Sequence, residues 1–425
     1  MGLQLLASCV DKDCYSFYNL KSRCIVSKSN KDFFKKKKEW SKTKDEILGS
    51  YLVPYFSKLL TKNVPICYVD CFAGKGVFDS GEIGSPLIAL HIMEERLKSC
   101  KKLKASNIFA YFIEPIYYIC LQNNINAVND SRIVKKVVPG KFEDHIKTIL
   151  NTHNNQTVFL YIDPYGIKCL DVAFFNGLKS NENQSIELLI NFNTWGFFRN
   201  ACKVLKIDLA LEPEIESYLG DDEASGNFEK EDLTRIAGGD YWINIVKNYQ
   251  ISGDAKAAEQ ELSKRIADKF KEEFKYVLNV PIKSGLNNKT PKYRLYHLSN
   301  HSGGCLLMAD VMFKRINDSF VRLKSGQTSL FDYSAEGELL DYNDVKKLVL
   351  QQLPNANTRI TDFVCSFFIN NGVITSIKTI NDVLKELNRD GVVLIKRYPP
   401  NKNGRLTTFM KEGGNQKVVI RRVDK

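Results

Sequence analysis

The sequence lacks any apolar run of about 18 residues, the length that a helix needs to cross a membrane. Its first residues are apolar only briefly and no basic stretch precedes them, so we expect no secretory signal peptide. Leu6 stands where N-myristoylation requires serine or threonine. These absences predict a cytoplasmic protein that has no membrane partner.

Paired cysteines are absent as well. The 11 cysteines include no C-x-x-C pair. The nearest approach to a cluster, formed by Cys9, Cys14 and Cys24, does not have the spacing of a zinc site. A disulfide framework is typical of short secreted chains rather than of a chain of 425 residues. We therefore expect free thiols and no metal site.

Acidic residues are in the minority, with 49 Asp and Glu against 61 Lys and Arg, which gives a net charge of +12. Such an excess of positive charge favours polyanionic partners. The basic run at 35–38 is equally compatible with a solvated helix face. With 44% hydrophobic residues the composition is that of a globular protein, and the length suggests two or three domains.

A helix is predicted over residues 41–60, where apolar side chains recur at spacings of three and four. Ser41 is a suitable N-cap, and Pro54 is expected to kink the helix or split it. Five short apolar segments follow, separated by helix-like stretches, and cover residues 66–72, 108–115, 132–140, 158–166 and 186–193. This alternation predicts an α/β fold whose mostly parallel sheet is covered by helices on both faces.

A hairpin is predicted next, because residues 274–283 and 293–300 flank a stretch rich in turn-forming residues. One reversed strand in a seven-stranded, otherwise parallel sheet is the Rossmann-like arrangement of class I S-adenosylmethionine (SAM) methyltransferases. The last part reads as three helices, at 343–352, 359–370 and 376–389, followed by a hairpin with a polar tip, which predicts a winged-helix-like module.

The predicted domains follow from these elements. An N-terminal extension covers residues 1–30, and the Rossmann domain covers residues 31–325 with a helical insertion at about 200–275. A linker at 324–338 leads to the winged-helix-like domain at 335–425.

The stretch D-C-F-A-G-K-G at 70–76 places a glycine turn after the first strand. In an open parallel sheet the ligand crevice lies beyond this end of the strands, and glycines let backbone N–H groups approach a ligand. The third glycine of the dinucleotide fingerprint is absent, and Lys75 does not fit the P-loop pattern. The stretch is close to the first motif of SAM-dependent methyltransferases, so Asp70, Phe72, Ala73, Gly74 and Gly76 are predicted to bind SAM.

Two further strand ends carry residues that suit SAM. Glu114 ends the second strand, where an acid accepts the ribose hydroxyls in Rossmann-type sites. Gly140 follows the third strand, where the adenine edge would lie, and Phe142 is near enough to pack on the ring. Alternatively, Glu114 is a surface acid and Gly140 forms a simple turn.

The sequence D-P-Y-G at 163–166 follows the fourth strand. The Asp163 carboxylate and the Pro164 carbonyl are predicted to accept both N–H groups of an exocyclic amine, which favours a nucleophilic nitrogen in the transition state. Tyr165 is predicted to stack on a base that has left its helix. In the alternative interpretation Asp163 caps a turn and Tyr165 lies in the core.

These motifs together resemble the three-Cys-motif partner protein family, a group of bacterial and phage-associated methyltransferase-like proteins. The matching stretches are FFKKKKEWSKTKDEILGSYL, YVDCFAGKGVFDSGEIGSPL, YFIEP, FLYIDPYG and ELLINFN, with a weaker match at YRLYHLSNHSGGCLLMADVM. The resemblance spans about residues 31–320 and implies a radical-SAM-like neighbour as partner, which carries the three cysteines. The loop at 81–87, typical of this family, is expected to close over SAM, with Ser85 capping the next helix.

The same core is similar to ribosomal-RNA adenine methyltransferases that carry a lysine on the helix before the first strand. This resemblance implies that Lys44 meets the SAM carboxylate. It also implies an acid at Glu114 and a D-P-P-Y motif at Asp163. The chain departs from the pattern in two places, because Pro139 replaces an acid before Gly140 and the second proline of the motif is missing.

The sequence thus predicts a SAM-dependent methyltransferase that modifies an amino nitrogen of DNA or RNA. The C-terminal module is expected to bind phosphates through its basic wing residues, Lys396, Arg397, Lys402 and Arg405. The alternative is a non-catalytic or SAM-binding adaptor subunit for the radical-SAM-like partner.

Overall fold

The computed structural model describes residues 37, 39–100, 108–178, 185–209, 227–283, 290–325, 339–399, 412 and 416–423. Up to the fifth strand the elements are α2 (Glu39–Thr61), β1 (Ile66–Asp70), α3 (Ser85–Ser99), β2 (Ile108–Ile113), α4 (Tyr118–Ile125), β3 (Ile133–Val138), α5 (Phe142–Thr152), β4 (Thr157–Ile162), α6 (Val172–Asn176) and β5 (Ser185–Phe192). They continue with α7 (Thr194–Val204), α9 (Lys230–Ala237), α10 (Trp242–Ser252), α11 (Ala255–Phe270), β6 (Tyr276–Ile282), β7 (Tyr293–Ser299) and α12 (Ser302–Ser325). The last elements are α13 (Tyr342–Gln352), β8 (Thr358–Arg359), α14 (Ile360–Asn371), α15 (Ile377–Arg389), β9 (Val393–Tyr398) and β10 (Lys417–Arg422).

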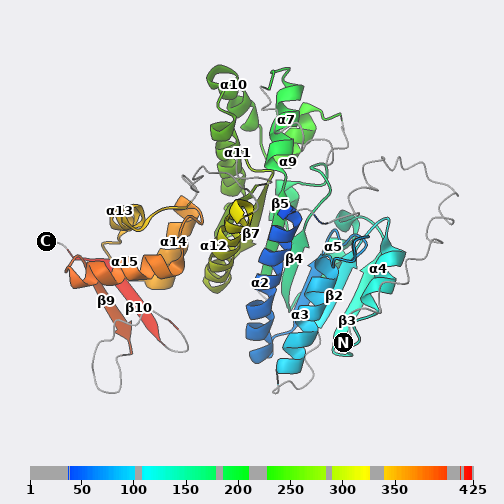
Figure 1. Ribbon diagram of the computed structural model, residues 1–425, viewed down its shortest axis with the longest axis horizontal. Coiled ribbons are helices and arrows are strands. Elements are labelled where there is room, and N and C mark those ends of the chain that lie inside the picture. The colour runs from blue at the N-terminus through cyan, green and yellow to red at the C-terminus, as the bar shows by residue number, and fades with distance from the viewer. Residues whose placement is uncertain are drawn as a thin grey trace. The chain divides into compact units, whose positions relative to one another are not determined.

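Seven strands form one sheet in the order β3-β2-β1-β4-β5-β7-β6, and Figure 1 labels β3, β2, β4, β5 and β7 among them. β1 pairs in parallel with β2 and β4, and β2 pairs in parallel with β3. β7 runs antiparallel to both β5 and β6, so the predicted hairpin is confirmed. The prediction of an α/β fold with a mostly parallel, seven-stranded sheet is therefore confirmed, and the sheet is compatible with a Rossmann-like fold. Its strand order reverses between β1 and β4, which is where open sheets of this kind bind ligands.

The described residues form two compact units. The first contains those up to Leu170, with Ser185 and the described part of 202–233, and the second contains 171–178, 186–201 and the described residues from Thr234 onward. Within these ranges, no helix combines the length and the apolar composition that crossing a bilayer requires. The cysteines of the described part are free thiols, as expected; they are Cys67, Cys71, Cys100, Cys120, Cys169, Cys202, Cys305 and Cys365.

Aromatic packing fixes α2 against the first unit's strands. Tyr51 and Tyr55 of α2 lie with their ring centroids 5.5 and 5.4 Å from that of Phe159 on β4, and Tyr68 of β1 stacks on the same ring. All are buried. Since a short connection leads from α2 into β1, the helix runs back along the strand. Its N-terminal half therefore lies at the carboxyl edge of the sheet.

Two details of α2 bear on the predictions made for this helix. The helix begins at Glu39, so Ser41 lies within its first turn and the predicted N-cap is wrong. The helix also continues through Pro54 to Thr61 without splitting. A proline removes one backbone hydrogen bond, and the buried aromatic side chains on either side of Pro54 hold the helix against the strands.

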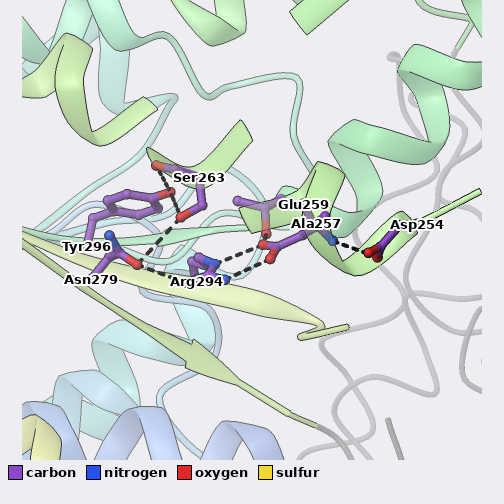
Figure 2. A network of polar contacts seen from close by, with 8 residues as sticks. Asp254, Ala257, Glu259, Ser263, Asn279, Arg294 and Tyr296 are labelled. Atoms are coloured by element: carbon purple, nitrogen blue, oxygen red, sulfur yellow. Dashed lines mark hydrogen bonds and ion pairs between the residues drawn. The ribbon is translucent and has the colours of Figure 1, made fainter. Parts of the chain in front are cut away.

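A buried polar network joins α11 to β6 and β7 in the second unit (Figure 2). Arg294 donates from Nε and Nη2 to the two oxygens of Glu259, at 2.8 Å each. Thr194 Oγ1 donates to the same carboxylate at 2.6 Å, and Arg294 Nη1 donates to Asn279 Oδ1 at 3.0 Å. Because the carboxylate and the guanidinium compensate each other, the network fixes these elements without an isolated buried charge.

The C-terminal module contains the three predicted helices, here α13, α14 and α15, and the predicted closing strands β9 and β10 (Figure 1). A third strand, β8, has only two residues, Thr358 and Arg359, and was not predicted. It pairs with β10, which gives a three-stranded sheet in the order β8-β10-β9. Such a short strand has no alternating pattern that the sequence would reveal.

Candidate functional site

Three carboxylates lie at the carboxyl edge of the first unit's strands. Asp70 ends β1, Glu114 follows β2 and Asp163 follows β4. Backbone hydrogen bonds continue past the strand ends: Cys71 N donates to Tyr161 O at 2.9 Å, and Ala73 N to Ile113 O at 3.1 Å. The predicted acids are thus brought to one edge of the sheet.

The glycine turn after β1 has a left-handed backbone. Gly74 has φ 60° and Gly76 has φ 79°, conformations that side-chain-bearing residues rarely adopt. A Cβ atom on Gly76 would lie 3.0 Å from Leu121 Cδ1. Asn124 of α4 donates to the Lys75 carbonyl at 2.7 Å, and Gly84 N donates to the Gly76 carbonyl at 2.8 Å. The turn is therefore held in place by its neighbours.

Glu114 fixes this turn from the side of β2. One carboxylate oxygen accepts the Gly74 N–H at 3.0 Å, and the other accepts those of Ile116 and Tyr117 at 2.8 and 2.9 Å. A carboxylate has about four acceptor positions, so these bonds leave roughly one for another donor. The predicted contact of Glu114 with both ribose hydroxyls stays a prediction.

Asp70 is a fully buried carboxyl group. Ser85 Oγ donates to Oδ2 at 2.7 Å, and Phe72 N donates to Oδ1 at 3.3 Å. Burial nevertheless raises the pKa of Asp70 to about 7, and the charges of Asp163 and Asp45 add to this effect. The predicted capping role of Ser85 is wrong, because the N-cap of α3 is Gly84 and the Ser85 hydroxyl is directed to Asp70.

Asp163 forms an ion pair with Lys44 of α2. The ammonium group lies 2.8 and 2.9 Å from the two carboxylate oxygens, and the Tyr161 hydroxyl donates to Oδ2 at 3.1 Å. Lys44 is buried and Asp163 is partly buried. Lys44 and Asp163 were predicted to serve the donor and the acceptor respectively, and here they contact each other.

A second ion pair, which the sequence did not reveal, joins Lys37 to Asp45. Burial raises the pKa of Asp45 to about 6, although Lys37 and Lys44 lower it. No local pattern in the sequence signals this pair. Lys37 is the residue of the basic run at 35–38 that lies within the described part of the chain, and its pairing with Asp45 shows that this lysine is not part of a solvated face.

The loop at 81–87, predicted to close over SAM, overlaps a small hairpin at 77–83 and the start of α3 at Ser85. A bridge pairs Val77 with Ile83, and Phe78 N donates to the Glu82 carbonyl at 2.8 Å. Lys37 ties the loop to the chain before α2, since its ammonium donates to the Ile83 carbonyl at 2.9 Å and its N–H to Glu82 Oε2 at 3.2 Å. Lys37 thus anchors the loop next to its own ion pair with Asp45.

Exposed apolar side chains occur in the loops that follow the same strand ends and, for Ile119, in the first turn of α4. Ile83, Ile116, Ile119 and Tyr165 are between 37% and 49% exposed, and they follow β1, β2, β2 and β4 respectively. We call these four residues the apolar rim. Exposed apolar side chains thus follow the same strand ends as the charged ones, and this combination suits a ligand that combines charge with a flat ring.

The other predicted site residues differ in accessibility. Phe142 is buried and its ring lies 5.1 Å from that of Phe72, which is partly exposed. Pro164 is buried and Tyr165 is exposed, so the interpretation of Tyr165 as a core residue is wrong. Lys396 and Arg397 lie on β9 of the second unit, whereas Lys402 and Arg405 lie outside the described residues.

The backbone of Gly140 has a conformation and a close neighbour that a larger residue would not tolerate. Its φ is 128°, and a Cβ atom would lie 2.5 Å from His145 Nε2, which donates to the Pro139 carbonyl at 3.0 Å. We expect Gly140→Ala to lower the free energy of unfolding by about 1–3 kcal/mol, measured by urea denaturation.

Two further variants separate backbone strain from the clash. Gly81 has φ 86° and open space around its Cβ position, so Gly81→Ala reports strain alone. Adding His145→Ala to Gly140→Ala should recover the part of the loss that the clash causes. A Gly140→Ala protein as stable as the wild type would show that the turn has a different geometry.

In the described part of the chain, no group of three or more His, Cys, Asp or Glu side chains is arranged to hold a metal ion. Comparison with known proteins adds no identification, because no family model matches the chain and no curated protein matches it.

Proposed function

We propose that this chain is a SAM-dependent methyltransferase that transfers a methyl group to an amino nitrogen of a nucleic acid. One observation carries the proposal. Buried or partly buried charges, those of Lys44, Asp70 and Asp163, meet beside a glycine turn where the strand order reverses. Burial raises the pKa of Asp70 among them, and carboxyl groups with perturbed pKa values concentrate at functional sites, where catalysis or binding requires them.

The Asp70 carboxylate at this edge would suit the charge of SAM. SAM is a sulfonium cation, and it would supply an electrophilic methyl group when bound. Gly74 and Gly76 leave the backbone of the turn accessible. The residues that would hold SAM are Lys44, Asp70, Phe72, Ala73, Gly74, Gly76, Glu114, Gly140 and Phe142.

Asp163, Pro164 and Tyr165 would serve the acceptor. The lone pair of an exocyclic amine is delocalised into its ring, so the nitrogen needs acceptors for its N–H groups before it becomes nucleophilic. The Asp163 carboxylate and the Pro164 carbonyl would provide them, and the exposed Tyr165 ring would stack on the base. The apolar rim would help to exclude water.

The C-terminal module would position the nucleic acid. Its elements follow in the order helix, strand, helix, helix, strand, strand, which supports a winged-helix-like fold. Lys396 on β9 would contact phosphates. Arg397, Lys402 and Arg405 were predicted to act with it, but Arg397 is the next residue along the strand and so lies on the opposite face of the sheet.

A non-catalytic role is the second candidate. The Asp163 carboxylate already accepts hydrogen bonds at both oxygens from Lys44, and the D-P-Y-G motif has one proline fewer than amino-methyltransferases carry. Both features favour an adaptor subunit that binds SAM, or no cofactor, and docks on a radical-SAM-like partner.

Labelled methyl transfer separates the two candidates. The full chain is incubated with SAM that carries a labelled methyl group, and with total RNA, sheared DNA or the purified partner protein. A methyltransferase labels RNA or DNA at its amino nitrogens. If the chain binds SAM but labels neither RNA, nor DNA, nor the partner protein, the result would favour the adaptor role instead.

A further inference from the structure

The three-stranded sheet of the C-terminal module has two different faces. The helices α14 and α15 pack against these strands, and the side chains directed toward the helices are buried. These buried side chains are Val393 and Ile395 on β9, and Val418 and Ile420 on β10. The alternate side chains therefore form the opposite face.

We call this opposite face the basic sheet face; it consists of Arg359, Leu394, Lys396, Tyr398, Lys417, Val419 and Arg421. The register places Lys417 opposite Tyr398, Val419 opposite Lys396 and Arg359, and Arg421 opposite Leu394. Four of the seven residues are basic and none is acidic. Arg359 pairs with Glu412 at 2.9 Å, whereas the other three cations have no acidic partner among the described residues.

The spacing of these groups suits a chain of phosphates with bases. Lys417 and Arg421 are four residues apart on one strand, which corresponds to about 13 Å. That span equals about four steps of 3.4 Å along a stacked nucleic-acid strand. Tyr398, at 48% exposure, is one of the most exposed large apolar side chains in the described part of the module.

The alternative surface of the module, helix α15, is less suited to a polyanion. Its acids already neutralise neighbouring lysines, since Asp382 lies 3.0 Å from Lys385, and Glu386 lies 2.7 Å from Lys346. Because the paired carboxylates offset these lysines, the helix offers fewer uncompensated cations to phosphates than the basic sheet face does. The charge distribution therefore favours the sheet over the helix, and an extended strand over a duplex.

We propose that the basic sheet face binds a single-stranded nucleic acid, with Lys396, Lys417 and Arg421 on its phosphates and Tyr398 stacked on a base. The proposal rests on the proposed function and names its substrate class. Single-strand sites of this kind combine cations that follow the backbone with an aromatic ring that accepts any base. An acidic peptide would satisfy the cations but would make no comparable use of the exposed ring.

The test measures binding by the full-length chain in the absence of SAM. A fluorescent 15-nucleotide single strand, as RNA and as DNA, is titrated at several salt concentrations. Replacing Lys396, Lys417 and Arg421 together by glutamine should weaken binding at least tenfold. The slope of log affinity against log salt should fall by about 2, since each single-strand phosphate contact contributes about 0.7.

A matched control removes the same charge from the helices of the module. Lys347, Lys378 and Lys385 are exposed lysines on α13 and α15, and their joint replacement by glutamine should change affinity by less than about threefold. Tyr398→Ala should weaken binding about 5- to 100-fold, whereas Tyr398→Phe should retain it. Thermal unfolding of each variant checks that the fold is intact.

The outcomes separate this inference from the proposed function. Binding of the single strand by the wild-type chain, without transfer of a methyl group from SAM, would contradict the proposed function alone. The inference would be overturned if the two triple variants lost affinity for the single strand equally, or if neither lost any. Tighter binding to a duplex or to an oligoglutamate peptide than to the single strand would also overturn it.

Discussion

Replacing Asp163 with alanine is expected to lower the rate of methyl transfer to nucleic acid by about 10²–10³-fold, the usual effect of losing one preorganised charge at a reacting centre. The affinity for SAM should change by less than about threefold, since Asp163 is assigned to the acceptor. The two quantities are measured by single-turnover transfer of a labelled methyl group and by calorimetry.

Two controls make this result interpretable. The variant leaves Lys44 without the partner that lies 2.8 Å away, so thermal unfolding must show that the protein still folds. Asp79→Ala removes an exposed acid from the loop after β1 and should transfer methyl groups at the wild-type rate. Wild-type turnover by a folded Asp163→Ala protein would exclude Asp163 from the chemistry.

Replacing Asp70 with asparagine is expected to stabilise the protein at pH 8 while weakening SAM binding. Because burial raises the pKa of Asp70 to about 7, the folded state retains this proton at pH values where the unfolded chain has released it. Stability therefore falls as pH rises from about 4 to about 7. Asparagine removes this contribution and should raise the free energy of unfolding at pH 8 by a few kcal/mol.

SAM binding should show the opposite dependence on pH. A deprotonated Asp70 attracts the sulfonium cation, so wild-type affinity should rise about tenfold between pH 6 and pH 8, because one favourable ionic contact contributes about 1.4 kcal/mol. The Asp70→Asn variant should bind SAM more weakly than the wild type at pH 8, and its affinity for SAM should be nearly independent of pH. Asp45→Asn serves as the control, since Asp45 titrates near pH 6 beside Lys37.

The opposite pattern would contradict this account. An Asp70→Asn protein that is less stable at pH 8, and that binds SAM with unchanged pH dependence, would make Asp70 a purely structural acid.

Much of the fold was readable from local patterns. The apolar segments at 66–72 and 158–166 predicted β1 and β4, and the turn-rich stretch before residue 293 predicted the reversed strand. These features depend on residues that are close in sequence, for which periodicity and turn composition are direct signals. The glycine turn was readable for the same reason.

The pairing of side chains across the site was not readable. Lys44 and Asp163 are 119 positions apart, and nothing in either segment indicates that the ammonium meets that carboxylate. Ser85 looked like a helix cap because serine often is one, but the nearby buried Asp70 offers its hydroxyl a charged acceptor. Such contacts depend on the three-dimensional arrangement of strand ends, which local patterns do not determine.

Calorimetric titration of SAM into the full chain at pH 8 tests the central claim most directly. The account predicts one saturable site per chain with a dissociation constant below about 1 mM, weakened at least tenfold by Asp70→Asn. A titration without saturable heat, or an equal affinity in the variant, would contradict the assignment of this sheet edge to SAM.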